Sequence, residues 1–161
     1  CGTTDPKFRG TLNSFLTFKG ISLNMSFNFQ WGGQTYNQTL ASRVEGVNPN
    51  SNCDRRVLYD RWKKPGDITD IPRYGVTAQL DDRFLENSSF LRLKNLTLAY
   101  AFPQSLLKKT NFFTSARVYL QGQNLLTWTG FTGLDPEVAT NVYRAQYPAS
   151  RQFTLGIDVS F

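Results

Sequence analysis

Histidine is absent from this sequence of 161 residues, and only two cysteines are present. Without histidine, every Ser-His and Cys-His catalytic arrangement is excluded, together with the commonest general base. Cys1 and Cys53 are too few for a disulfide framework, and without histidine they match no usual zinc-ligand spacing. We therefore expect no metal, no cofactor and no enzyme activity.

Long apolar runs are also missing. A transmembrane helix needs a run of about 18 or more apolar residues, and the sequence contains no such run. A spanning β-strand remains compatible with the sequence, because it needs only about 9–11 residues, of which alternate ones face lipid. The net charge of +6 comes from basic residues scattered among acidic ones, so we interpret it as solvated loops and expect no nucleic-acid partner.

What the sequence does contain is alternation of apolar and polar residues with period two, which is typical of strands with two different faces. Residues 21–30 and 152–161 alternate without exception. The alternation is weaker in residues 8–18, 91–102 and 116–126, and we predict five strands in all. The apolar positions change parity within residues 91–102, which predicts a bulge near Asn95.

The connections alternate between short and long. Lys19-Gly20 forms a tight turn and residues 103–114 a moderate connection, whereas residues 31–89 and 127–151 are long. Long structureless loops are uncommon in compact soluble domains, but outer-membrane barrels combine short periplasmic turns with long extracellular loops. We therefore predict an all-β fold in which antiparallel strands form a segment of a transmembrane β-barrel.

Five strands alone are too few for such a barrel, because bacterial barrels use an even number from about eight upward. We therefore expect residues 1–161 to be a C-terminal fragment whose remaining strands lie N-terminal to it. The structural alternative is a soluble β-sandwich. The length of the strands and the aromatic residues near strand ends, where membrane interfaces favour them, weigh against it.

The order and spacing of several motifs resemble those of one family. They are Thr4-Asp5-Pro6-Lys7-Phe8-Arg9-Gly10, Arg61-Trp62-Lys63-Lys64-Pro65-Gly66-Asp67, Ile71-Pro72-Arg73, residues 89–100, Gly122-Gln123-Asn124-Leu125-Leu126, Gly133-Leu134-Asp135-Pro136-Glu137, and Tyr147-Pro148 ahead of the last strand. Together they resemble the C-terminal part of the SusC/RagA family of TonB-linked outer-membrane transporters of Bacteroidetes.

The resemblance implies a whole protein with a barrel of about 22 strands and an N-terminal plug. It also implies a place in the outer membrane, contact with its lipid, and import of oligosaccharides or peptides. The implied partners are a SusD-like surface lipoprotein and the TonB complex, which would act through the part missing here. The plug is absent from these residues, so the fragment alone would transport nothing.

Three groups of residues are candidates for a role beyond packing. We expect Phe161 to act as a barrel-assembly signal. Polar residues on the inward face of two strands are candidates for facing the lumen: Arg92, Lys94, Arg117, Tyr119, Gln121 and Gln123. Aromatic residues in the long loops are candidates for contact with substrate or with the lipoprotein lid: Tyr59, Trp62, Tyr74, Trp128, Phe131 and Tyr143. A hydrated wall and loops packed on themselves are the plainer interpretations.

Other functions stay open at this point. The chain could be a surface binding or structural module, either a soluble carbohydrate-binding β-fold or an adhesion barrel. A barrel enzyme, such as a lipase or protease, is disfavoured because histidine is absent and no acid pair has a useful spacing on the strands.

Overall fold

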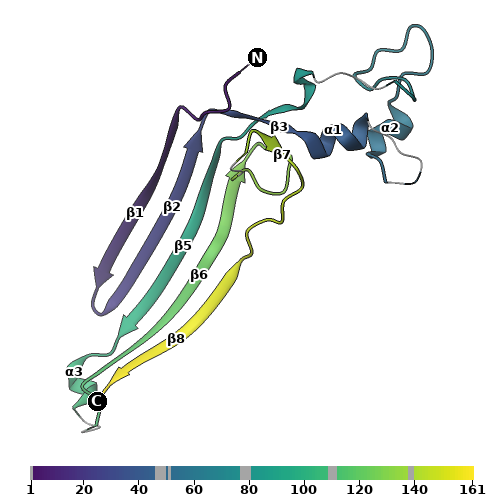
Figure 1. Cartoon of the computed structure of the whole chain (residues 1–161). Coiled ribbons are helices and arrows are strands. Elements are labelled where there is room, and N and C mark those ends of the chain that lie inside the picture. The colour runs from purple at the N-terminus through teal and green to yellow at the C-terminus, as the bar shows by residue number, and fades with distance from the viewer. Residues whose placement is uncertain (1, 46–49, 51, 77–80, 109–111, 138–139) are drawn as a thin grey trace. The chain divides into compact units, whose positions relative to one another are not determined.

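A computed structural model describes residues 2–45, 50, 52–76, 81–108, 112–137 and 140–161 (Figure 1). The chain divides into two compact units. The sheet unit consists of Lys7–Trp31, Ser89–Thr129 and Pro148–Phe161, and the loop unit consists of Cys1–Pro6, Gly32–Ser88 and Gly130–Tyr147. Among the described residues, no helix has the length and apolar character needed to cross a membrane.

The sheet unit is one antiparallel sheet in the order β1-β2-β5-β6-β8 (Figure 1). Its strands are β1 (Phe8–Phe18), β2 (Ile21–Trp31), β5 (Phe90–Ala101), β6 (Ser115–Thr129) and β8 (Gln152–Ser160). All five lie where alternation predicts them, although β6 continues three residues beyond its predicted end at Leu126. The sheet does not close on itself, because β1 pairs only with β2, and β8 only with β6, within the described chain.

The short connections have the predicted character. Lys19 and Gly20 both have positive φ, of 46° and 85°, as a two-residue type I′ turn requires. A side chain at Gly20 would place its Cβ 2.8 Å from the carbonyl oxygen of Ala101, so glycine is needed there for space as well as for conformation. The connection from β5 to β6 contains one helical turn, α3 (Gln104–Leu107).

The predicted bulge near Asn95 is present. Ser26 on β2 pairs with Asn95, but the next residue, Phe27, pairs with Leu93, so Lys94 is the extra residue of β5. The bulge reverses the parity of the strand. As a result, Leu93 lies on the same face as Leu96, and one face of β5 stays apolar along its whole length.

The register aligns the alternation of all five strands. On one face of the sheet, the rows of residues paired across the five strands are mainly apolar. Examples are Leu16–Leu23–Leu98–Leu120–Leu155 and Phe18–Ile21–Tyr100–Val118–Ile157. Rows on the opposite face are mainly polar, for example Asn13–Ser26–Asn95–Gln123–Gln152. We call these the apolar face and the polar face of the sheet unit.

The two long connections, predicted from the sequence only as loops, contain short elements of their own in the loop unit. They contain β3 (Gln34–Asn37), α1 (Gln38–Val44), α2 (Arg55–Tyr59), η1 (Asp82–Phe84), β4 (Leu85–Asn87) and β7 (Val142–Tyr143). The three strands form a second sheet in the order β4-β3-β7, in which β3 and β7 are parallel. A small core of Ala41, Val44, Ile71 and Phe84 holds the unit together.

Helix starts in the loop unit follow ordinary capping chemistry. The side chain of Asn37 accepts a hydrogen bond from the backbone amide of Leu40 at the start of α1. The side chain of Asp54 accepts one from the backbone amide of Arg56 at the start of α2. Each cap satisfies one of the amides that the first helical turn leaves unpaired.

Candidate functional site

Five of the six polar candidates lie in rows of the polar face. Arg92 pairs across the sheet with Asn28 and Thr127, and Arg117, Tyr119, Gln121 and Gln123 occupy alternate positions of β6. The sixth candidate, Lys94, is the exposed bulge residue of β5. The strand register therefore brings residues from two separate motifs onto one surface.

Arg92 is the most enclosed of these residues, with only 4% of its surface exposed. Its Nε donates to Thr127 Oγ1 at 3.1 Å, and its guanidinium lies 5.6 Å from the ring centroid of Phe90. A buried guanidinium is tolerated only when it is hydrogen-bonded, so these contacts fix its position.

Arg117 forms an ion pair across the sheet. Its guanidinium lies 2.9 Å from the Asp158 carboxylate of the neighbouring strand and 5.5 Å from the ring centroid of Tyr119. Both charged side chains are about half exposed, so the pair contributes little to stability but neutralises two charges of the polar face. Asp158 was not among the candidates predicted from the sequence.

Tyr119 covers a glycine on the adjacent strand. Tyr119 pairs directly with Gly156, and a Cβ placed at Gly156 would lie 2.2 Å from the Tyr119 Cζ. The ring therefore occupies the space that any side chain at position 156 would need. Glycine in a strand is otherwise unfavourable, and an aromatic cross-strand neighbour compensates for it.

Between the charged positions, the polar face presents uncharged side chains. Gln121 Nε2 donates to Asn95 Oδ1 at 3.0 Å, and Thr11 Oγ1 donates to Asn28 Oδ1 at 3.1 Å. Such a surface can bind water or a neutral hydrogen-bonding ligand through many exchangeable contacts.

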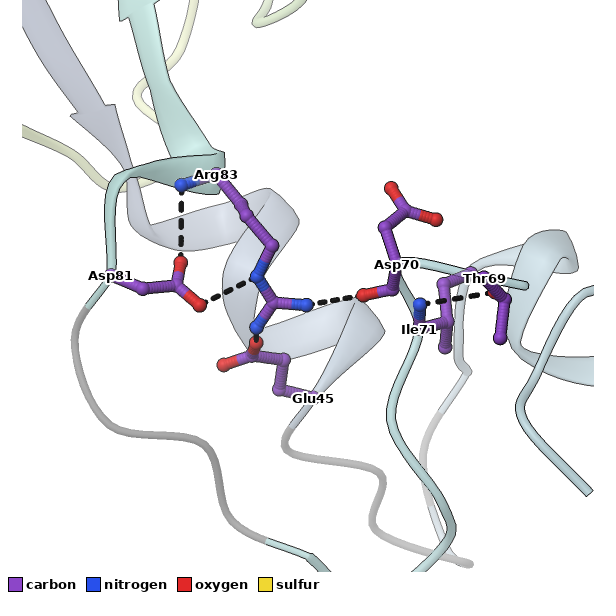
Figure 2. Close-up of polar contacts among 6 residues, drawn as sticks. All are labelled: Glu45, Thr69, Asp70, Ile71, Asp81 and Arg83. Carbon is purple, nitrogen blue, oxygen red and sulfur yellow. Dashed lines mark hydrogen bonds and ion pairs between the residues drawn. The ribbon is translucent and has the colours of Figure 1, made fainter. Parts of the chain in front are cut away.

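In the loop unit, Arg83 joins three segments (Figure 2). Its guanidinium pairs with Asp81 at 2.5 Å and with Glu45 at the end of α1, and it also donates to the carbonyl oxygen of Asp70. Burial raises the pKa of the Glu45 carboxyl above its ordinary value, although the Arg83 charge opposes this. Arg83 thereby fixes the loop that ends at Ile71 against α1.

Glu86 connects the two long connections. Its carboxylate accepts hydrogen bonds from the Asn37 amide at 2.9 Å and from the backbone and hydroxyl of Thr132, at 2.7 and 2.6 Å. Further along, Ala145 donates its amide to Thr39 Oγ1 at 2.7 Å. The segment from Gly130 to Tyr147 is therefore held on β3 and α1 by directed bonds.

A pocket of about 510 Å³ opens in the loop between α2 and Ile71. Three cations, two acids, Ile68, Thr69 and Tyr59 line it. Trp62 donates its amide to the carbonyl of Ile71 at 3.1 Å, and Thr69 donates its hydroxyl to the carbonyl of Asp60, so the base of the loop is closed.

The predicted loop aromatics fall into different environments. Tyr59 and Tyr74 are exposed, with Arg55 and Arg61 lying 5.5 and 5.0 Å from their ring centroids, and Trp62 is half-buried. These three remain candidates for contact with a ligand or lid.

The other three aromatics lie in a strand or in packed surroundings. Trp128 lies in β6, opposite Leu91 on the apolar face, which corrects its predicted place in a loop. Phe131 and Tyr143 are buried and pack edge to face at 5.1 Å, and the Tyr143 hydroxyl accepts the Leu134 amide. These contacts give Phe131 and Tyr143 a packing role in the loop unit.

Phe161, the predicted assembly signal, is exposed beside a second aromatic residue. Its ring stacks on Phe112 with centroids 6.0 Å apart, and Phe112 in turn meets Phe113 at 5.1 Å. The contact joins the end of the β5–β6 connection to the end of β8.

Sequence reasoning missed Arg83, Glu86 and Gly156 because most of their partners are distant in sequence. Glu86 meets Thr132 across 46 positions, and Gly156 meets Tyr119 only through the register of β6 and β8. A glycine interrupting an alternating strand is a local signal that could have indicated Gly156.

No family model matches the chain. Among curated proteins it is similar to TonB-dependent receptor P3 of Formosa agariphila, with 34% identity over 99% of this chain and 17% of that protein. It is also similar to TonB-dependent receptor SusC of Bacteroides thetaiotaomicron, with 27% identity over 93% of this chain and 15% of that protein. The chain thus spans about a sixth of the length of these curated relatives.

Solved structures agree. The chain is similar to a chain of the RagAB peptide transporter, with a TM-score of 0.89 and 38% identity over 99% of this chain and 18% of that one. It matches the same importer in its "open-open" state with a TM-score of 0.88.

The chain is homologous to a segment of TonB-dependent receptors, which are transporters rather than enzymes and reside in the outer membrane. Within that class its homologues include the SusC/RagA-type receptors, as the sequence motifs predicted. The predicted location in the outer membrane and the absence of an enzyme function are confirmed by this homology.

Proposed function

We propose that the chain forms five neighbouring strands, in the C-terminal part of the barrel wall, of a TonB-dependent nutrient importer. In this proposal the apolar face contacts lipid, the polar face lines the lumen, and the long connections lie on the extracellular side. The observation that carries the proposal is the continuous apolar face of the sheet unit.

Large apolar side chains of this face are exposed on all five strands, including Leu12, Phe29, Leu98, Leu120 and Leu155. Soluble monomers seldom expose a contiguous apolar patch larger than a few hundred Å², because such a patch leads to association. A soluble binding module would have to cover this face with another layer. A lipid environment needs no such cover.

Aromatic residues lie at both ends of the face, as expected for membrane interfaces. Phe8 and Trp31 pair at one end of the β1–β2 hairpin, and Phe18 lies at the other. The ten residue steps between Phe8 and Phe18 correspond to about 33 Å along the strand, or about 25 Å of depth at a tilt of about 40°. This depth is that of the apolar band of outer-membrane barrels.

On the polar face, Arg92, Arg117, Tyr119, Gln121 and Gln123 would contact the lumen, with Lys94 at the bulge. An exposed position beside Phe112 supports Phe161 as the residue read by the assembly machinery.

The cargo of the whole protein would be a peptide or an oligosaccharide. Similarity to a peptide importer and to SusC supports this range. A SusD-like surface lipoprotein would close the barrel, and the TonB complex would act through a plug outside this chain. The whole barrel would contain about 22 strands, as the resemblance implies.

Uptake tests the proposal directly. Cells that express the full-length protein should accumulate a labelled peptide or oligosaccharide, and the accumulation should be lost when either this protein or TonB is removed. Accumulation that persists without TonB would contradict the proposed function, since passive entry needs no energising partner.

A further inference from the structure

We propose that the pocket between α2 and Ile71 binds acidic peptide cargo, an inference that rests on the proposed import function. The residues that carry it are Arg61, Lys63 and Lys64, whose side chains line the pocket beside Tyr59 and Ile68. Both lysines are exposed, and no ion pair joins either of them to an acid among the described residues.

Two acids, Asp60 and Asp67, also line the pocket, and neither forms an ion pair with Lys63 or Lys64 among the described residues. The Asp67 carboxylate accepts the backbone amides of both Lys63 and Lys64 at 3.0 Å, and Gly66, with φ of 101°, completes the turn. Asp67 therefore stabilises the backbone of the turn through its carboxylate. The two ammonium groups at the turn remain available to an external anion.

The pocket is formed before any ligand arrives. The bonds from Trp62 to Ile71 and from Thr69 to Asp60 close the base of the loop, and the bond from Arg83 to the Asp70 carbonyl fixes it (Figure 2). The backbone that carries the cations is thus fixed before binding, so the main ordering cost on the protein side is that of the exposed lysine side chains.

Apolar surface next to the cations indicates which kind of anion fits. Ile68 is fully exposed at the pocket, and Tyr59 is two-thirds exposed. Sugar rings stack on flat aromatic faces, but the exposed branched side chain of Ile68 suits an aliphatic side chain better. A peptide that combines carboxylates with aliphatic residues complements both features, whereas an acidic saccharide complements the charges alone.

Binding can be measured on the purified full-length protein in detergent, with fluorescence anisotropy of a labelled heptapeptide of alternating Glu and Leu. The double variant Lys63→Gln/Lys64→Gln should weaken binding about tenfold at low salt, and the difference should shrink in 0.5 M salt because exposed charges are screened. The matched control is Lys19→Gln/Lys108→Gln, which removes two exposed lysines from the sheet unit and should leave binding unchanged.

Several results would overturn the proposal. One is equal binding of the peptide by the wild type and the Lys63/Lys64 variant. Another is that a control heptapeptide with Gln in place of each Glu binds as tightly as the acidic peptide. A third is that an acidic saccharide, oligogalacturonate, binds and the peptide does not. Loss of a co-purifying surface protein from the variant, with no peptide bound by either form, would assign the pocket to a partner and also contradict it. Because the assay needs neither TonB nor uptake, its failure leaves the import function standing, and TonB-independent uptake would refute only that function.

Discussion

Arginine substitutions along β8 should reveal which face of the sheet contacts lipid. Paired residues on neighbouring strands of a tilted barrel wall lie at different depths, so depth is counted along β8 itself (Gln152–Ser160). Leu155 lies next to Gly156, the central residue of β8, and therefore near the bilayer midplane in the proposed arrangement. Val159 lies two rows nearer to the end of the strand on the same face.

The expected magnitude follows from depth. Each row advances about 5 Å in depth, from two residues of about 3.3 Å at a tilt of about 40°. Leu155→Arg should thus cost about 2–4 kcal/mol of the free energy of unfolding. The cost of Val159→Arg, about 10 Å from the midplane, should fall to about 0–1 kcal/mol.

The assay is urea unfolding of the full-length protein in lipid vesicles, followed by the gel mobility of the folded form. Thr154→Arg is the matched control, because Thr154 lies on the polar face beside Leu155 and pairs with Gln121. It should cost little. Equal destabilisation by the substitutions at Leu155 and Thr154, or a cost at Val159 equal to that at Leu155, would refute the assignment of this face to lipid.

Two further predictions concern local contacts. Gly156→Ala should cost about 1–3 kcal/mol in the same urea assay, because its Cβ would lie 2.2 Å from the Tyr119 Cζ, and an equal cost in a Tyr119→Ala background would contradict this reasoning. Hydrogen bonding from the Arg56 side chain lowers the pKa of Asp54 below its ordinary value of 3.8. Ionised Asp54 therefore stabilises α2 fully above pH 3.8, and this stabilisation is lost as the pH falls through the lower pKa of the folded state. Asp54→Ala should therefore reduce hydrogen-exchange protection of α2 at pH 7, and the difference from wild type should shrink in strong acid; a difference that persists undiminished would show that the charge is not responsible.

The sheet unit could be predicted because its signals are local. Strand β2 alternates at every position, the Lys19-Gly20 turn requires positive φ, and a parity change placed the bulge within one residue. The end of β6 was predicted too early. Its alternation is interrupted around Asn124, whose φ is 52°, and the regular pairing resumes at Leu126.

The loop unit could not be predicted as a unit. Strand β3 has four residues and β7 has two, and Tyr36 pairs with Val142 more than a hundred positions away. Such short strands carry no detectable periodicity. The caps at Asn37 and Asp54 were available signals for helix starts, but only the tertiary contacts of α1 and α2 explain why helices so short are stable.

The pairing of Gln34 with Asn87 bears on the order of folding. Strands β2 and β5 are neighbours, yet 58 residues separate Trp31 from Phe90. Closing so long a loop costs entropy that grows with the logarithm of its length. If β3 and β4 pair first, only a few residues separate the Gln34–Asn87 pair from the end of β2 and from the start of β5. The entropic cost of then pairing β2 with β5 is lower by about 2 kcal/mol. The β3–β4 pairing would then hold the ends of β2 and β5 close together during folding. Insertions elsewhere in the loop unit would be tolerated, whereas loss of the β3–β4 pairing would slow the addition of β5 to the sheet.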